Sequence, residues 1–177
     1  MTTAPSTAMP MIDTALSAPV GMPPGPDALA QVRRRRAIGV RPGQSVAITY
    51  GTYDLFHVGH LRLFERIKQR CDFLIVAVST DRFNAVKGKA SIVPFEDRLA
   101  IVRSCRSVDH AIAEDGWDQK ARDIAEYGID LFVMGDDWAG KFDALTALCD
   151  VSYLPRTEGV SSSELKRRLA HCAESNA

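Results

Sequence analysis

The sequence has no long apolar run: nothing in its 177 residues approaches the roughly 18 consecutive apolar residues that a membrane-spanning helix needs. The N-terminus also lacks the basic-then-apolar order of a signal peptide. The 4 cysteines form no C-x-x-C pair and no ligand-like cluster with the 4 histidines, so neither a zinc site nor a disulfide framework is indicated. We therefore expect a cytoplasmic protein with reduced thiols and no metal site built from its own residues.

An excess of charge of one sign is missing as well. Lys and Arg total 22, and Asp and Glu total 22, so the chain has no overall field that would hold it on nucleic acid or on an anionic membrane. Its length gives room for one domain with a substantial core, or for a smaller domain with a tail. Any phosphate chemistry must therefore come from a local group of residues.

The first 44 residues are predicted to be an extension that is disordered or partly helical. Met1 to about Asp27 is mostly Ala, Thr, Ser, Met, Gly and Pro without a sustained period, which is typical of disorder. The segment from Ala28 to Ala37 favours a short helix that carries the run Arg33–Arg36. We interpret this run as a solvated helical segment or linker, with anion binding as the alternative. A cleaved transit peptide fits poorly, because the segment contains acidic residues and many prolines.

Residues 45–170 are predicted to form the domain, followed by a C-terminal tail at 171–177. Short apolar runs rich in β-branched residues predict buried strands at Val46–Tyr50, Phe73–Ser79, Val108–Ala113, Leu131–Met134 and Val151–Leu154. Helices are predicted between and after them, at His60–Gln69, Phe95–Arg103, Trp117–Tyr127, about Phe142–Cys149 and Ser163–Ala170. This alternation predicts an α/β fold, with a doubly wound, five-stranded, Rossmann-like parallel sheet. Ligands of such sheets bind beyond the carboxyl ends of the strands.

The strongest local signal is GTYDLFHVGH, from Gly51 to His60, which leads from the first strand into a helix. Gly51 and Gly59 let the backbone approach a ligand closely, and the free N–H groups at the helix start favour a phosphate. His57 and His60 are three residues apart, so both imidazoles can point to one side. Hydrogen bonds from two imidazoles would stabilise the charge of an in-line phosphoryl transition state. The alternative is that both are helix-cap and surface residues.

Two other phosphate-binding patterns are absent from the sequence. The chain has no G-x-x-x-x-G-K-[ST] motif and no G-x-G-x-x-G after a strand, so neither a P-loop nor an ordinary dinucleotide site is indicated. Near the last predicted helix, Arg156 is followed by small hydroxyl residues, which also suits phosphate oxygens. An ordinary N-capped helix start is the alternative there.

Several motifs together carry a resemblance to a known family. GTYDLFHVGH resembles the signature of the cytidylyltransferase-like HxGH nucleotidyltransferases, and RTEGVSS at Arg156–Ser162 resembles the second nucleotide motif of their cytidylyl branch. The similarity continues through VSTDRFN, KGK, WDQK and FVMGDDWAGKFD, and from Ser45 to about Leu169 the chain resembles the bacterial glycerol-3-phosphate cytidylyltransferases. Where that group usually has threonines, this chain has serines at 161–163, which keep the hydroxyl group.

The resemblance implies where CTP binds. It gives catalytic roles to His57, His60, Lys89 and Arg156, with Lys89 on a mobile loop. It places the nucleotide against Thr52, Tyr53, Asp54, Gly59, Asp137, Thr157, Glu158, Gly159, Ser161 and Ser162. Within this set Asp54 is expected to orient the histidine loop and Asp137 to contact the nucleoside, although either could be only a turn-forming residue.

The resemblance also implies an acceptor site and a reaction. Lys87, Lys120 and Trp117, supported by Arg106 and Asp109, would bind glycerol 3-phosphate, because an acceptor phosphate needs cationic partners. The alternatives are a core position for Trp117 and a solvated helix position for Lys120. Mg²⁺ is expected to arrive bridging the CTP phosphates, and a homodimer is expected. The expected products are CDP-glycerol and pyrophosphate.

Two other functions are compatible with the same motifs. A related nucleotidyltransferase could use ATP, or could act on phosphoethanolamine, a sugar phosphate or a cofactor precursor. A regulatory protein that binds nucleotides without turnover is the alternative of another class. The presence of His57, His60, Lys89 and Arg156 argues against it, since a site without turnover has no physical need for all four.

Overall fold

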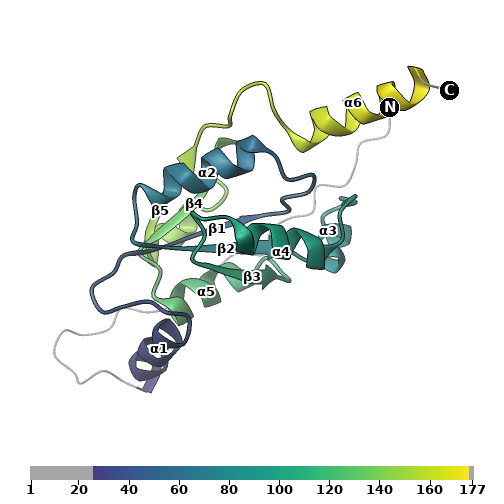
Figure 1. Cartoon of the computed structure of the whole chain (residues 1–177). Helices are drawn as coiled ribbons and strands as arrows, with labels where there is room; N and C mark the ends of the chain where they lie inside the picture. The colour runs from purple at the N-terminus through teal and green to yellow at the C-terminus, as the bar shows by residue number, and fades with distance from the viewer. Residues whose placement is uncertain (1–25, 176–177) are drawn as a thin grey trace.

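The computed structural model describes residues 26–175, and these form an α/β domain preceded by a helix (Figure 1). The strands in this range are β1 (Val46–Gly51), β2 (Phe73–Ser79), β3 (His110–Glu114), β4 (Leu131–Gly135) and β5 (Asp150–Leu154). They build one sheet in the order β3-β2-β1-β4-β5, and every neighbouring pair is parallel. The predicted five-stranded parallel sheet is therefore confirmed.

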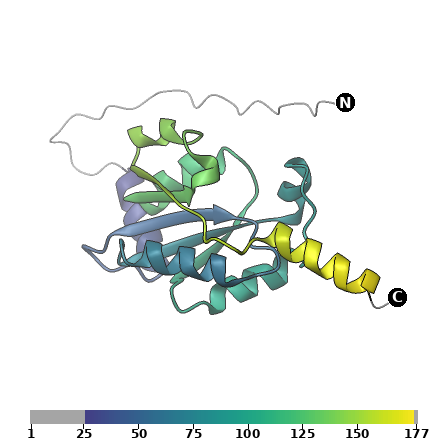
Figure 2. The same ribbon diagram turned by 90° about the horizontal axis from the view of Figure 1, so that it is seen from above.

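Helices cover both faces of this sheet. The helices that follow β1 are α2 (Val58–Lys68), α3 (Asp81–Val86), α4 (Phe95–Ser104), α5 (Gln119–Tyr127) and α6 (Ser162–Ser175), with 3₁₀ turns η1 (Asp136–Trp138) and η2 (Asp143–Ala147). Helix α6 extends away from the sheet rather than covering it (Figure 1). Apolar residues of α2 and α4 pack on one face, and those of α5 and η2 pack on the other (Figure 2). Along β1, Ala47 belongs to the first layer whereas Ile48 and Tyr50 belong to the second. Burial on both faces explains why the strands read as continuous apolar runs.

Some element bounds differ from those predicted. Helix α3 was not predicted; its first turn is capped by the hydroxyl of Thr80, which accepts the N–H of Phe83 at 3.2 Å. The helix expected near residues 142–149 is the short 3₁₀ turn η2. Strand β3 begins at His110 rather than Val108 and reaches Glu114, one residue further than expected. Helix α6 continues to Ser175, so the predicted tail at 171–177 begins as the end of a helix.

The order of the strands fixes where a ligand can enter. The chain moves outward from β1 through β2 to β3, then crosses back to place β4 on the other side of β1. The crossover directions therefore change between β1 and β4, and the loops that leave their carboxyl ends diverge toward opposite faces. A crevice at such a switch point is the usual ligand site of an open parallel sheet.

A helix of the predicted extension, α1 (Pro26–Ala37), packs against α5. The side-chain amide of Gln31 donates to the carbonyl of Ala125 at 2.7 Å. The guanidinium of Arg35 donates to the carbonyl of Gly128 at 3.0 Å and to that of Gln44 at 2.6 Å. The interpretation of the arginine run as merely solvated is therefore wrong for part of it, because Arg35 attaches the helix to the domain. The predicted disorder falls mainly on residues 1–25, which lie outside the described residues.

We expect Arg35→Ala to lower the free energy of unfolding by roughly 1–3 kcal/mol, because two carbonyls lose a charged donor. Arg33→Ala is the matched control, since Arg33 is exposed on the same helix, and it should change stability by less than about 0.5 kcal/mol. Urea unfolding of both variants measures the difference. Equal stability of the two variants would show that α1 contributes no docking energy through Arg35.

Candidate active site

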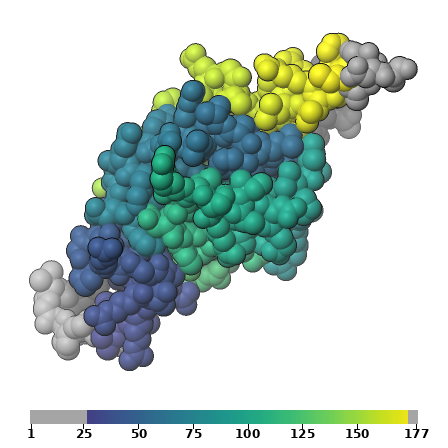
Figure 3. All heavy atoms as spheres, viewed as in Figure 1, coloured from purple at the N-terminus to yellow at the C-terminus, as the bar shows by residue number. Residues whose placement is uncertain are grey.

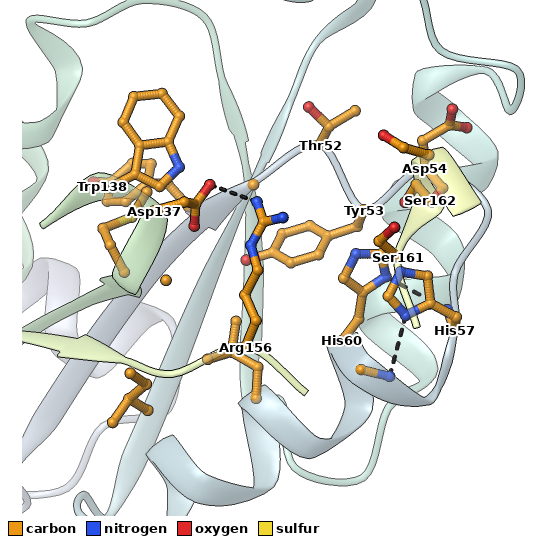
Figure 4. A pocket seen from close by; sticks show the side chains of 18 of the residues that line it. Thr52, Tyr53, Asp54, His57, His60, Asp137, Trp138, Arg156, Ser161 and Ser162 are labelled. Atoms are coloured by element: carbon orange, nitrogen blue, oxygen red, sulfur yellow. Dashed lines mark hydrogen bonds and ion pairs between the residues drawn. The ribbon is translucent and has the colours of Figure 1, made fainter. Parts of the chain in front are cut away.

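A cleft of about 460 Å³ opens at the carboxyl ends of β1 and β4. Its walls are the loop from β1 into α2, the segment after α3, the start of α5, the turn after β4, and the segment from β5 into α6. Figure 4 shows the part nearest the histidines, with Arg156 and Asp137 on one side and the serines of the α6 start on the other. Most segments that face the cleft therefore follow a strand or begin a helix, as expected for this sheet, and the segment after α3 is the exception.

Two stacked imidazoles stand at the start of α2. His57 is the N-cap residue, and its Nδ1 accepts the backbone N–H of Gly59 at 3.1 Å. The Nδ1 of His60 faces the backbone N–H of His57 at 3.4 Å, and the ring centroids are 3.8 Å apart. A side chain at position 59 would meet the His57 ring at 2.9 Å, so Gly59 is needed for this arrangement. Because both Nδ1 atoms act as acceptors, both Nε2 atoms carry the proton of a neutral imidazole.

The surroundings of the histidines favour the neutral form. Burial lowers the pKa of His60 to about 3, and the nearby charges of His57 and Arg156 act in the same direction against the opposing effect of Asp54. Burial also lowers the pKa of His57. Near pH 7 the pair therefore offers two neutral N–H donors to the cleft, at the positive end of the α2 dipole.

The carboxylate of Asp54 connects the histidine loop to two other segments. It accepts the backbone N–H of Val93 at 2.9 Å and that of Ile92, and it pairs with Lys166 of α6 at 2.8 Å. Its backbone carbonyl accepts the hydroxyl of Ser162 at 2.7 Å. Burial opposes ionisation, but these donors hold the pKa of Asp54 below its usual range. The contacts of Asp54 thus link the histidine loop to the segment before α4 and to α6, which is compatible with the orienting role predicted for it.

The floor of the cleft under α5 contains two lysines and an acid. Lys120 Nζ lies 2.5 Å from Glu114 Oε1, and Lys87 Nζ lies 3.6 Å from Glu114 Oε2. Lys87 also donates to the hydroxyl of Ser79 at 2.7 Å. Aromatic rings surround the group: Lys120 Nζ is 4.6 Å from the centre of the Tyr50 ring and 4.9 Å from that of Trp117. The floor thus carries a net positive charge in largely apolar surroundings.

Comparison with known proteins identifies the family. The cytidylyltransferase-like family model matches residues 48–168, which is most of the chain. The chain belongs to the cytidylyltransferase-like family. It is 53% identical over 123 residues to the glycerol-3-phosphate cytidylyltransferase of Bacillus subtilis (strain 168), a match that covers 70% of this chain and 95% of that protein. Identity to the enzyme of the same name from Staphylococcus aureus is 50% over 122 residues, covering 69% and 92%.

A solved structure supports the fold of this family member. The lipopolysaccharide core biosynthesis protein from Thermoplasma volcanium GSS1 superposes with a TM-score of 0.57 at 23% identity, covering 65% of this chain and 98% of that one. At this identity the similarity concerns the fold alone. The family match begins after α1, so the helix that packs on α5 lies outside the region shared with the family model.

Most residues that the sequence singled out in this cytidylyltransferase-like chain line the one cleft. They are Thr52, Tyr53, Asp54, His57, Gly59, His60, Lys87, Lys89, Trp117, Lys120, Asp137, Arg156, Thr157, Ser161 and Ser162. Tyr53 is almost fully buried, with its ring edge-on to His60, so it supports the imidazole from behind. Lys120 is buried in the floor, which excludes the alternative of a solvated helix lysine. Ser161 also caps α6, since its hydroxyl accepts the N–H of Glu164 at 3.1 Å.

Four of the predicted residues lie away from the cleft. Arg106 and Asp109 precede β3 and so lie at the amino edge of the sheet, opposite the site; Asp109 accepts the N–H of Leu74 at 2.7 Å and pairs with Lys68. The structure therefore does not bring these two residues to the cleft where the acceptor site was predicted. Glu158 and Gly159 are exposed and absent from the lining, and Gly159 turns the chain with a φ of +75°.

Sequence reasoning missed three residues of the site. Glu114 was left outside the predicted strand, although its position at the carboxyl end of β3 was a usable signal. Trp138 was not singled out, and it lies in the turn after β4, with Lys89 Nζ 5.8 Å from its ring centre. Lys166 reaches Asp54 from the second turn of α6. No local pattern marks a pairing between residues so distant in the sequence.

Between residues 26 and 175, no group of three or more His, Cys, Asp or Glu side chains is arranged to hold a metal ion. In the same range, no helix combines the length and the apolar character needed to cross a membrane.

We expect the His60 imidazole to stay neutral between pH 8 and about pH 4, because burial lowers its pKa to about 3. Since the unfolded chain binds a proton at this residue near pH 6.5, His60 lowers the stability of the fold as the pH falls from about 6.5 toward 3. NMR titration of the imidazole resonances measures the pKa, with the protein in urea as the reference. A His60 midpoint near 6.5 in the folded protein would contradict the neutral pair.

Proposed function

We propose that the chain transfers the cytidylyl group of CTP to glycerol 3-phosphate, giving CDP-glycerol and pyrophosphate. The observation that carries this proposal is the presence, in one cleft, of a neutral histidine pair at a helix start and a buried lysine floor. The first suits a triphosphate and the second suits a separate phosphate on an acceptor. The names of the two relatives described above support the choice of CTP and glycerol 3-phosphate.

In the proposed reaction, a phosphate oxygen of the acceptor attacks the α-phosphorus of CTP in line. The new P–O bond forms as the bond to the bridging oxygen breaks, and that oxygen leaves with its electron pair as part of pyrophosphate. Mg²⁺ bound with CTP, rather than held by side chains of residues 26–175, would neutralise part of the charge on the phosphates. The protein positions both phosphates and stabilises the charge of the transition state, and no covalent enzyme intermediate is needed.

The proposed roles at the triphosphate follow from the donors that the cleft offers. His57 and His60 donate their Nε2–H groups to the α-phosphoryl oxygens, beside the N–H groups of α2. Lys89 reaches the cleft from the segment after α3, and Arg156 reaches it from the segment between β5 and α6. Arg156 is paired with Asp137 at 2.6 Å, but both side chains are substantially exposed, so exchanging this partner for a phosphate costs little. Asp137 then becomes free to accept hydrogen bonds from the nucleoside.

The proposed acceptor site is the lysine floor, with Trp117 as its apolar wall. Both carboxylate oxygens of Glu114 are engaged by Lys120, Ser79 and Lys87. The groups left facing an acceptor are therefore ammonium groups and aromatic rings. This favours an acceptor with an anionic phosphate and disfavours one that brings a second cation, such as phosphoethanolamine. The homodimer implied by the resemblance and the cytoplasmic location expected from the composition stay predictions.

The decisive experiment is pyrophosphate release with a panel of nucleotides and acceptors. We expect turnover with CTP and glycerol 3-phosphate to exceed that with ATP or with phosphoethanolamine by at least about 100-fold in kcat/KM. Glycerol itself should be a very poor acceptor, because it brings no anion to the lysine floor. A preference for another pair would reassign the substrates, and no turnover with any pair would support a nucleotide-binding regulatory protein.

We expect His57→Ala and His60→Ala to remain folded and to lower kcat by about 100-fold or more, the usual cost of losing a donor to the transition state. Circular dichroism tests the fold, and steady-state kinetics test turnover. His171→Ala, at the far end of α6, is the control for loss of a histidine away from the cleft. Near-normal kcat in both active-site variants would remove this mechanism.

A further inference from the structure

Glu114 is a buried acid for which the proposed reaction has no chemical role. It ends β3, and only 3% of its side chain is exposed. One oxygen is 2.5 Å from Lys120 Nζ, and the other accepts the hydroxyl of Ser79 and lies 3.6 Å from Lys87 Nζ. The two lysines are nearly as buried, with 3% and 9% of their side chains exposed. A single carboxylate therefore lies between two buried cations.

Two buried ammonium groups near one another are unfavourable without an anion. Burial disfavours the charged form of each lysine, and each charge disfavours the other. At Lys87 these effects are visible: burial lowers its pKa to about 8, the charges of Lys89 and Lys120 add to the decrease, and Glu114 opposes it. Without the carboxylate, the pKa of Lys87 would fall further, and a neutral Lys87 would no longer attract a phosphate.

We propose that Glu114 is a positioning residue that holds both Lys87 and Lys120 in place and keeps Lys87 charged, so that the floor of the cleft can bind the acceptor phosphate. The binding of an acceptor phosphate by the floor rests on the proposed function, whereas the effect of Glu114 on the lysines does not. Both oxygens of Glu114 are already engaged, so the residue neither touches the reacting atoms nor accepts a proton in the reaction. It acts only through the lysines.

Titratable groups of β1 and α5 also lie close to this cluster. Tyr50 of β1 faces Lys120, and its hydroxyl donates to Asp123 of α5 at 2.9 Å. Burial first, and then the charge of Asp123, raise the pKa of Tyr50, so it stays neutral. Burial raises the pKa of Asp123. Lys89 is the other cation that affects Lys87. Glu114 is therefore the carboxylate in direct contact with both ammonium groups.

The direct test is a measurement of the pKa of Lys87 in ligand-free protein, by NMR of its side-chain nitrogen. In Glu114→Gln, an isosteric change, we expect the pKa of Lys87 to fall by about 1–2 units. In Lys120→Met we expect the opposite, a rise, because Lys87 loses a neighbouring cation and keeps the carboxylate. Should Glu114→Gln fail to fold, Glu114→Asp is the second variant: its side chain is one methylene shorter, so the carboxylate lies further from Lys87 and the pKa of Lys87 must also fall. An unchanged Lys87 pKa in the folded glutamate variant would overturn the proposal.

Kinetics then test the link to the acceptor. At pH 7.5 Glu114→Gln should raise the KM for glycerol 3-phosphate roughly 3- to 30-fold, with little change in the KM for CTP. Lowering the pH to 6 should restore the ratio of variant to wild-type KM to about twofold or less, because Lys87 regains its proton. Glu126→Gln, which removes an acid paired with Arg34 at the other end of α5, is the matched control and should show neither effect.

These two measurements separate the two proposals. If the wild-type protein shows no turnover with any acceptor, the proposed function fails, while the NMR titrations still decide whether Glu114 keeps Lys87 charged. If the wild-type enzyme is active and the KM ratio does not depend on pH, Glu114 is only a structural ion-pair partner, and the positioning role is wrong.

Discussion

The carboxyl edge of the sheet is organised around one fully buried cation, the guanidinium of Arg98. It donates to the carbonyl of Thr52 at 2.5 Å, to that of Ser79 at 2.8 Å and to that of Val93 at 2.9 Å, and it pairs with Asp81 at 2.6 Å. These acceptors belong to the ends of β1 and β2, the loop before α4 and the start of α3. Breaking such a set would leave several buried carbonyls without donors, so the loops of the site are held in one arrangement.

The buried histidines and the buried lysines at this edge differ in whether an anion lies beside them. The histidines have no anion in contact, so burial leaves them neutral, and neutral N–H groups suffice to bind phosphoryl oxygens. The lysines have Glu114 between them, which offsets burial and keeps positive charge in the floor. The cleft therefore combines a neutral donor region, suited to a triphosphate that brings its own metal ion, with a cationic region suited to a lone phosphate.

The sequence predicted the parallel sheet and the histidine loop because both depend on local patterns. Apolar runs such as Phe73–Ser79 mark buried strands, and the H-x-G-H spacing follows one of them directly. The sequence was less able to predict which residues meet at the same edge of the sheet. Arg106 and Asp109 were attributed to the acceptor site through resemblance, although residues that precede a strand lie at the amino edge. Glu114 and Lys166 were missed because their partners become neighbours only through the tertiary fold.

The added helix α1 is compatible with the site because the two occupy different edges of the domain. Its contacts are with the end of α5 and with the segment before β1, which are the amino side of the sheet, whereas the cleft opens at the carboxyl side. The space-filling view places α1 and α6 at opposite ends of the molecule (Figure 3). Helix α5 runs between the two edges, with Lys120 in its first turn at the cleft and the α1 contacts at its end. An extension that docks there can stabilise α5 without covering the lysine floor, because the helix itself separates the two.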